Sequence, residues 1–117
     1  MKNIKREYIP TNREGHFFKC ELYYDLGGIN YFTYGTRARG YYVSVCPVER
    51  RTTDYGVTME SYTAFSGVAD LAVQCDRQSK KNEQRAAELY ESRRDELMAL
   101  PRFAEYRTAA QTIREAV

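Results

Sequence analysis

The aromatic residues of this chain are gathered in its first half. Of the eleven tyrosines and five phenylalanines, thirteen lie before residue 66, and there is no tryptophan. Aromatic and β-branched side chains favour strands because they pack well on a pleated surface. Between Gln74 and Glu96 there is no Gly or Pro, and Lys, Arg, Glu, Gln and Ala dominate, which favours a helix. The predicted order is therefore a sheet followed by a helix.

The length and composition indicate one folded domain. The chain has 117 residues, of which 43% are hydrophobic and 29% charged, as in ordinary globular proteins. We predict a single α+β domain over 1–117. It is divided into a polar lead-in over 1–15, a sheet over 17–65, a long helix over 66–97 and a short helix over 101–115.

Four strands are predicted in the first half. Residues 17–24 are followed by Gly27 and Gly28, which permit a tight turn, and residues 29–34 form the return strand. Residues 41–48 and 57–65 form a second hairpin, and Pro47 is expected at an edge or a bulge. The predicted sheet is four-stranded, mainly antiparallel and built from two hairpins.

The long helix is predicted from a change of period at Ser66, a suitable N-cap. Apolar residues then follow at helical spacing, at Val68, Leu71, Ala72 and Cys75. The apolar stripe thins between 77 and 84, and a helix that lacks enough core often finds it in another subunit. We therefore predict a homodimer through this helix. Pro101 breaks the helix and begins a short one.

The core is predicted where the sheet meets the long helix. The residues expected there are Phe18, Cys20, Leu22, Val43, Val45, Met59, Phe65, Val68, Leu71, Ala72 and Cys75.

The sequence predicts that this protein is not an enzyme. His16 is the only histidine, and Cys20, Cys46 and Cys75 lie far apart, without a metal-ligand spacing. No nucleophile elbow, zinc-protease, phosphate-loop or dinucleotide motif occurs. We predict no catalytic residue, no cofactor and no metal site.

Charge and hydropathy restrict the partners. The net charge is only +2, from 18 basic and 16 acidic residues, which is below the excess typical of dedicated nucleic-acid binders. No stretch approaches the roughly 20 apolar residues that cross a bilayer, so we expect a cytoplasmic protein that does not bind membranes.

A basic, tyrosine-rich strand is the best candidate for a binding surface. The run 39–45 begins like the RNA-recognition-motif octapeptide, with a basic residue, Gly and an aromatic. It then departs from that pattern, and four successive strands differ from that family's β-α-β order, so its function is not carried over. Aromatic side chains on an open sheet face can stack bases while arginines contact phosphates; the alternative is that they form a core under the helix. The candidate residues are Arg37, Arg39, Tyr41, Tyr42, Arg50 and Arg51.

At GYYVSVCPVERR and GVTMESYTAFSG the chain resembles uncharacterised small proteins of plasmids, conjugative elements and phages from gut Firmicutes. Proteins of that kind include inhibitors of host defence, such as anti-CRISPR proteins, which typically act by binding. The resemblance implies a non-catalytic binding protein of a mobile element that engages a host protein or a protein–nucleic-acid complex. The alternative is a protein that binds nucleic acid directly through the basic, tyrosine-rich sheet edge.

Overall fold

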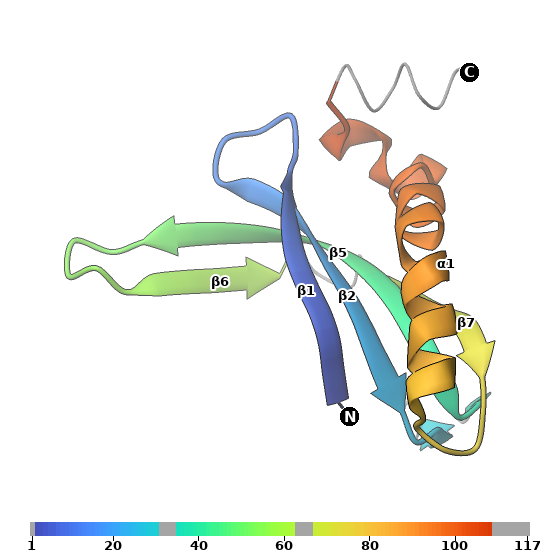
Figure 1. Ribbon diagram of the computed structural model, residues 1–117. Coiled ribbons are helices and arrows are strands. Elements are labelled where there is room, and N and C mark those ends of the chain that lie inside the picture. Colours follow the sequence, from blue (N-terminus) through green and yellow to red (C-terminus); the bar gives the residue numbers. More distant parts are fainter. Residues whose placement is uncertain (1, 31–34, 63–66, 109–117) are drawn as a thin grey trace.

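The computed structural model describes residues 2–30, 35–62 and 67–108, and it is an α+β fold, as predicted (Figure 1). A mostly antiparallel sheet precedes one α-helix and a short 3₁₀ helix. The elements are β1 (Lys2–Pro10), β2 (His16–Asp25), β3 (Gly28–Asn30), β4 (Gly35–Arg37), β5 (Gly40–Thr52), β6 (Thr58–Tyr62), β7 (Val68–Gln74), α1 (Lys80–Met98) and η1 (Pro101–Tyr106).

The main sheet has five strands instead of the predicted four, and β5 is its centre. The order is β1-β2-β5-β6, and β7 also pairs with β5. Because β2 occupies one edge of β5, both β6 and β7 lie along the other edge, against Val48–Thr52 and Gly40–Val45 respectively. Pro47 lies in the gap between these two pairings, where its lack of an N–H leaves no ladder bond to lose.

The first hairpin is longer than predicted. Strand β2 returns through β5, and the small β3–β4 sheet continues the same register, from Asp25 opposite Gly40 to Asn30 opposite Gly35. The prediction of a reversal at Gly27 was therefore wrong. Gly27 instead has φ +73°, and a Cβ there would lie 2.6 Å from the Arg37 carbonyl oxygen. Of the predicted return strand 29–34, positions 31–34 lie outside the described residues.

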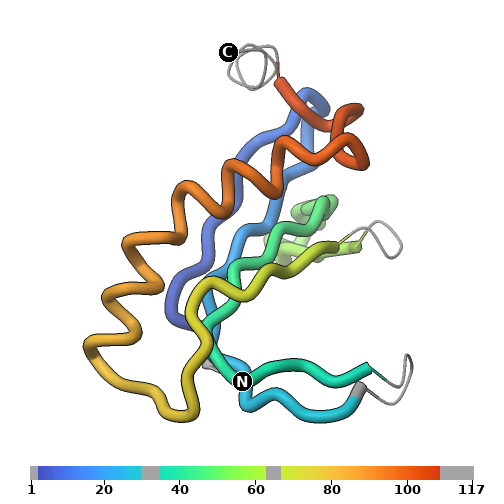
Figure 2. Tube along the Cα trace, turned by 90° about the vertical axis from the view of Figure 1, so that its right-hand side faces the viewer, coloured from blue at the N-terminus to red at the C-terminus, as the bar shows by residue number. Residues whose placement is uncertain are grey.

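The β3–β4 extension forms an arm at one end of the sheet. It projects away from the sheet on the side opposite α1 (Figure 2). The β5–β6 hairpin forms a second extension, which reaches sideways past β1 (Figure 1).

The predicted polar lead-in is also corrected, because most of residues 1–15 belong to an edge strand. Strand β1 pairs with β2 from Lys2 to Pro10, with a bulge between Asn3 and Lys5. Charged side chains are common on edge strands, where they discourage pairing with other chains. On the α1 side of β1, Glu7 accepts 2.7 Å hydrogen bonds from Tyr90 and Arg94, so a charged residue fastens the strand to the helix.

The helix begins later than predicted. Residues 68–74 form β7, and the N-cap of α1 is Ser79, whose Oγ accepts a 3.1 Å hydrogen bond from the Asn82 N–H. Ser66, the predicted cap, lies outside the described residues. The register of β7 shifts between Tyr41 and Tyr42 of β5, so that Ala72 is an extra residue in the ladder. Such a bulge interrupts the period of two, and here it leaves apolar residues at a spacing that resembles a helix.

Helix α1 covers one face of the sheet. It packs on β2, β5 and β7, and Arg93 joins Asp70 of β7 at 2.7 Å (Figures 1 and 2). The core beneath it contains five predicted residues: Phe18, Cys20, Leu22, Val43 and Val45. Val68, Ala72 and Cys75 are partly buried against it, and Leu71 is partly exposed. Met59 is 58% exposed, which contradicts its predicted place in the core, and Phe65 lies outside the described residues.

The core also contains aromatic residues that the prediction omitted. These are Tyr24, Tyr41, Tyr90 and Phe103. Phe103 comes from η1, the described part of the short helix predicted over 101–115, and it meets Phe18 edge to face at 5.7 Å. Residues 109–115 lie outside the described residues. No helix in the described part of the chain is long and apolar enough to cross a membrane.

Candidate functional site

The sheet face opposite α1, called here the second face, has a polar half and an aromatic half. Alternation along the strands places Lys19, Tyr23, Tyr42 and Glu60 on this face, while their neighbours point toward α1. Lys19 is only 8% exposed, and Tyr23 and Tyr42 are also buried. Side chains of the second face are therefore packed against one another, although α1 does not cover them.

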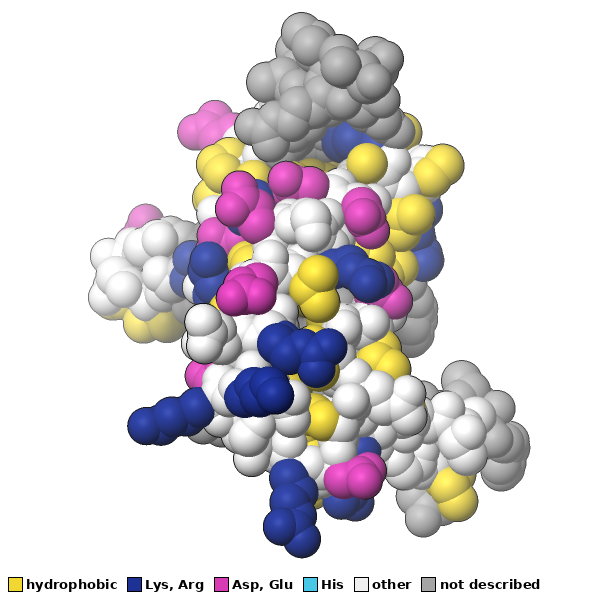
Figure 3. All heavy atoms as spheres, turned by 45° about the vertical axis from the view of Figure 1, so that its right-hand side comes forward, with side chains coloured by type: hydrophobic (Ala, Val, Ile, Leu, Met, Phe, Trp, Pro, Cys, Tyr) yellow, Lys and Arg dark blue, Asp and Glu magenta, His cyan; other side chains and the backbone are white. Residues whose placement is uncertain are grey.

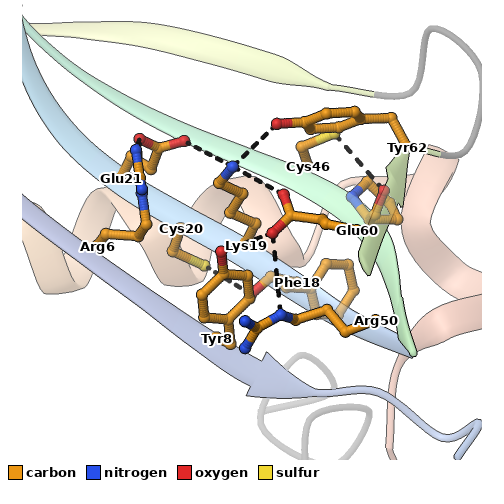
Figure 4. A network of polar contacts seen from close by, with 11 residues as sticks. Arg6, Tyr8, Phe18, Lys19, Cys20, Glu21, Cys46, Arg50, Glu60 and Tyr62 are labelled. Carbon is orange, nitrogen blue, oxygen red and sulfur yellow. Dashed lines mark hydrogen bonds and ion pairs between the residues drawn. The ribbon is translucent and has the colours of Figure 1, made fainter. Parts of the chain in front are cut away.

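The polar half is centred on Glu60 of β6 (Figure 4). Lys19 Nζ donates hydrogen bonds to Glu60 Oε1 at 2.8 Å and to Tyr62 Oη at 2.9 Å. Tyr8 Oη donates to Glu60 Oε2 at 2.7 Å. The guanidinium of Arg50 lies 4.1 Å from the centre of the Tyr8 ring. These contacts connect β1, β2, β5 and β6.

The Lys19–Glu60 pair holds both of its members in their charged forms. Burial alone would raise the pKa of Glu60, but hydrogen bonds from Lys19 and Tyr8 outweigh burial and hold that pKa below its usual value. Burial would likewise lower the pKa of Lys19, and its bonds to Glu60 and Tyr62 instead raise it. Lys19 therefore stays charged and is unsuited to act as a nucleophile or a base.

The aromatic half lies next to the β3–β4 arm. Tyr23 and Tyr42 are stacked, with ring centres 5.8 Å apart and an interplanar angle of 15°. Arg37 lies 4.2 Å above the Tyr42 ring and donates a 2.8 Å hydrogen bond to Tyr23 Oη. It also forms a 3.5 Å ion pair with Asp25. The Tyr42 hydroxyl donates to the Ala38 carbonyl at 2.6 Å, so both polar ends of this stack are satisfied within the chain.

The structure divides the six predicted surface residues. Arg37 and Tyr42 come together in the aromatic half, whereas Tyr41 points to the opposite face and is fully buried under α1. Arg50 is eight residues from Tyr42 along β5, a distance of about 26 Å in an extended strand. The predicted residues therefore do not form one continuous patch.

The remaining two predicted arginines also lie apart. Arg39 donates to the carbonyl oxygens of Leu26 and Asp76, which holds it near the start of α1. Arg51 lies at the far end of β5, where it forms a 2.8 Å ion pair with Glu49 and remains 75% exposed.

The exposed large apolar side chains lie on the two projecting arms. Leu26 and Ile29 are about 60% exposed beside and within the β3–β4 arm. The other four belong to the β5–β6 hairpin. Tyr62 lies on the second face beside Lys19, and we call the remaining three the hairpin cluster: Tyr55, Val57 and Met59. Tyr55 is 94% exposed at the turn, which is unusual for an aromatic residue.

The sequence prediction missed the hairpin cluster. It placed 57–65 in a strand with a buried side, because Val57, Met59 and Phe65 alternate with polar residues. The signal that could have found it is the turn Asp54-Tyr55-Gly56, because an aromatic side chain at a hairpin turn has no sheet beneath it to cover it.

No thiol in the described residues is activated for catalysis. Burial raises the pKa of Cys20 to about 12, and it raises the pKa of Cys46 and of Cys75 as well. Within residues 2–30, 35–62 and 67–108, no group of three or more His, Cys, Asp or Glu side chains could hold a metal ion.

Comparison with protein families, with curated proteins and with solved structures found no match for this chain.

Proposed function

We propose that this chain is a non-catalytic binding protein that docks on a protein partner through the hairpin cluster. The observation that carries the proposal is the position of Tyr55, Val57 and Met59, which are exposed on a projecting hairpin. Tyr, Met and Arg are enriched in the centres of protein interfaces, and an aromatic anchor often supplies much of the binding energy. Arg51 lies opposite Met59 in the ladder and completes that composition.

The polar network on the second face prepares the hairpin for binding. Glu60 of β6 is hydrogen-bonded to Lys19 of β2 and to Tyr8 of β1, so β6 is braced by two strands with which it does not pair. A braced binding element loses less conformational entropy on association than a flexible one. The hairpin cluster is therefore presented at a fixed position relative to the sheet.

For the biological setting, we propose a host protein or a protein–nucleic-acid complex as the partner, in an anti-defence role. This part rests on the resemblance at GYYVSVCPVERR and GVTMESYTAFSG to proteins of mobile elements. An exposed docking surface suits this role, because inhibitors of this class act by binding to a partner. The homodimer remains a separate prediction, but its original reason is weakened, since the apolar side of α1 packs on the chain's own sheet.

Direct nucleic-acid binding through Arg37, Arg39, Tyr41, Tyr42, Arg50 and Arg51 is the weaker alternative. Tyr41 and Tyr42 are buried, so neither ring offers a face for base stacking. Arg37 and Arg51 already have carboxylate partners.

The test is co-purification of the tagged protein from a bacterial lysate after nuclease treatment, with two variants in parallel. Y55S/V57T/M59T removes the exposed apolar groups of the hairpin, and L26T/I29T makes the matched change on the other arm. We expect a partner that survives nuclease, is lost with the hairpin variant and is kept by the control. With the purified partner, the hairpin variant should bind at least tenfold more weakly, which corresponds to about 1.4 kcal/mol.

Retention of that partner by Y55S/V57T/M59T would overturn the proposed surface. Loss of every partner on nuclease treatment would instead favour the nucleic-acid alternative.

A further inference from the structure

A group of basic side chains gathers where β7 leads into α1. Arg77, Lys80, Lys81 and Arg85 lie in the connection and the first two turns of α1, and all four are exposed. Arg39 joins them through its hydrogen bond to the Asp76 carbonyl. We call these five residues the basic end. Figure 3 shows Lys and Arg side chains gathered over the start of α1, with acidic side chains concentrated toward its other end.

The basic end is distinguished by the number of cations that it gathers without ion pairs. Several exposed or partly exposed arginines elsewhere face carboxylates, as Arg6 faces Glu21 at 3.1 Å and Arg93 faces Asp70 at 2.7 Å, whereas Arg13 and Arg102 are exposed cations that lie singly. None of the ion pairs among the described residues includes a member of the basic end. Asp76 and Glu83 lie in the same stretch, so five cations face two carboxylates there.

This charge distribution does not stabilise the helix. The N-terminus of a helix carries a partial positive charge that favours acidic side chains, and Lys80 and Lys81 occupy the first turn. The first turn also contains Glu83, so only part of this positive charge is balanced. In the second half of α1 the basic residues Arg93 and Arg94 are paired with Asp70 and Glu7. The cations at the start of α1 are thus the ones available to a ligand.

We propose that the basic end binds the phosphate backbone of a nucleic acid. An acidic protein surface would also supply negative charge, but protein interfaces are built around a desolvated apolar anchor. The exposed large apolar side chains of the described residues lie on the two arms, and none belongs to the basic end. Phosphate binding needs cations alone and is independent of base sequence. This inference goes beyond the proposed function, because it uses different residues and a different partner.

The acidic half of α1 limits the footprint. Along about 27 Å of helix from Lys80 to Met98, the cations outside ion pairs lie in the first half, because Arg93 and Arg94 in the second half pair with Asp70 and Glu7. A nucleic acid therefore crosses that end of the helix instead of following its whole length. About four or five phosphates would be contacted, and affinity for duplex DNA should fall with salt at a logarithmic slope of about −4.

The experiment measures fluorescence anisotropy of a labelled mixed-sequence DNA duplex, and of a single-stranded RNA, from about 50 to about 200 mM salt. The test variant is K80Q/K81Q. The matched control is R13Q/R102Q, which removes the same charge from two exposed positions outside the basic end. Removing cations from the first turn relieves the clash with the helix dipole, so K80Q/K81Q should fold at least as well as the wild type.

We expect the salt slope on duplex DNA to become about 2 units shallower in K80Q/K81Q and to stay near the wild-type value in R13Q/R102Q. Equal slopes for the two variants would overturn the proposal, as would absence of wild-type binding to either probe at about 50 mM salt. Loss of a nuclease-resistant protein partner by K80Q/K81Q would assign the basic end to a protein instead. The hairpin variant Y55S/V57T/M59T should bind DNA as the wild type does. Either proposal can therefore be disproved without affecting the other.

Discussion

Lys19 and Glu60 form a 2.8 Å ion pair between β2 and β6, two strands that are separated by β5 and share no ladder hydrogen bonds. The pair spans the width of β5 on the face that α1 does not cover. It therefore couples the projecting hairpin to the body of the sheet, in addition to the five ladder pairs that join β6 to β5.

Replacing one member of this pair should be costly. In E60Q the buried ammonium of Lys19 loses its closest carboxylate, and Glu21 at 3.8 Å is a weaker substitute. We expect a loss of about 2 to 4 kcal/mol in the free energy of unfolding, measured by urea denaturation. The double variant K19M/E60Q should be more stable than the sum of the two single changes predicts, because no unpaired charge remains. Strict additivity would show that the pair is not coupled.

Stability should fall in acid. Hydrogen bonds to Lys19 and to Tyr90 and Arg94 hold the pKa of Glu60 and of Glu7 below their usual values, although burial opposes the shift. A carboxyl whose pKa is lower in the folded state contributes stability above its unfolded pKa, about 4.3, and loses it as the pH drops through the folded pKa. The urea midpoint should therefore decrease from about pH 5 to about pH 3. The decrease should be smaller in E60Q, and an identical acid response in that variant would contradict the assignment.

Gly40 should not tolerate a side chain. A Cβ at this position would lie 2.2 Å from the Val73 carbonyl oxygen, so β7 would have to move away from β5. We expect G40A to lose about 3 kcal/mol of stability, at the upper end for an overpacked site. The comparison is G56N in the hairpin turn, where nothing lies within 4 Å of a Cβ and Asn accepts the positive φ of 80°. Similar thermal midpoints for G40A and the wild type would disprove this close approach.

The three cysteines should differ in reactivity. Cys20 is fully buried, and burial raises its pKa to about 12, whereas Cys46 and Cys75 are partly exposed. Iodoacetamide at about pH 8 should modify Cys46 and Cys75 first and reach Cys20 only when the chain unfolds. Peptide mass spectrometry over time separates the three sites. Early labelling of Cys20 under native conditions would show that the core beneath α1 opens readily.

The class of the fold and three of its strands could be predicted from local sequence. Aromatic and alternating runs located β2 and β5, and the run 57–65 located β6. The partner of β2 could not be found locally, because two glycines in the arm resemble a turn although the hairpin continues past them. Strand pairing depends on contacts between distant residues, and the short-range pattern does not contain them.

Strands β7 and β1 also differ from the sequence prediction, and in both cases the reason is a contact with a distant part of the chain. The β7 bulge at Ala72 gave a strand the apolar spacing of a helix, and the charged edge strand β1 resembled a polar tail. In both strands a charged residue pairs with an arginine of α1: Asp70 with Arg93 and Glu7 with Arg94. These partners lie more than twenty residues away along the chain.

The candidate surface was predicted by residue type, and the structure places its residues on different parts of the sheet. A tyrosine pair such as Tyr41 and Tyr42 necessarily points to both faces of a strand, so one ring had to face the helix. The hairpin cluster is exposed because α1 packs on β2, β5 and β7, and the local sequence of β6 does not contain that information.

The central position of β5 has a consequence for biosynthesis. The ribosome produces β1 to β6 before β7 and α1, so most of the sheet emerges while the helix that covers Tyr41, Val43 and Val45 is still unmade. During translation this side of the nascent sheet stays exposed to water until α1 has been synthesised. A ribosome that stalls before α1 would therefore release a chain whose apolar sheet face is exposed and prone to aggregate.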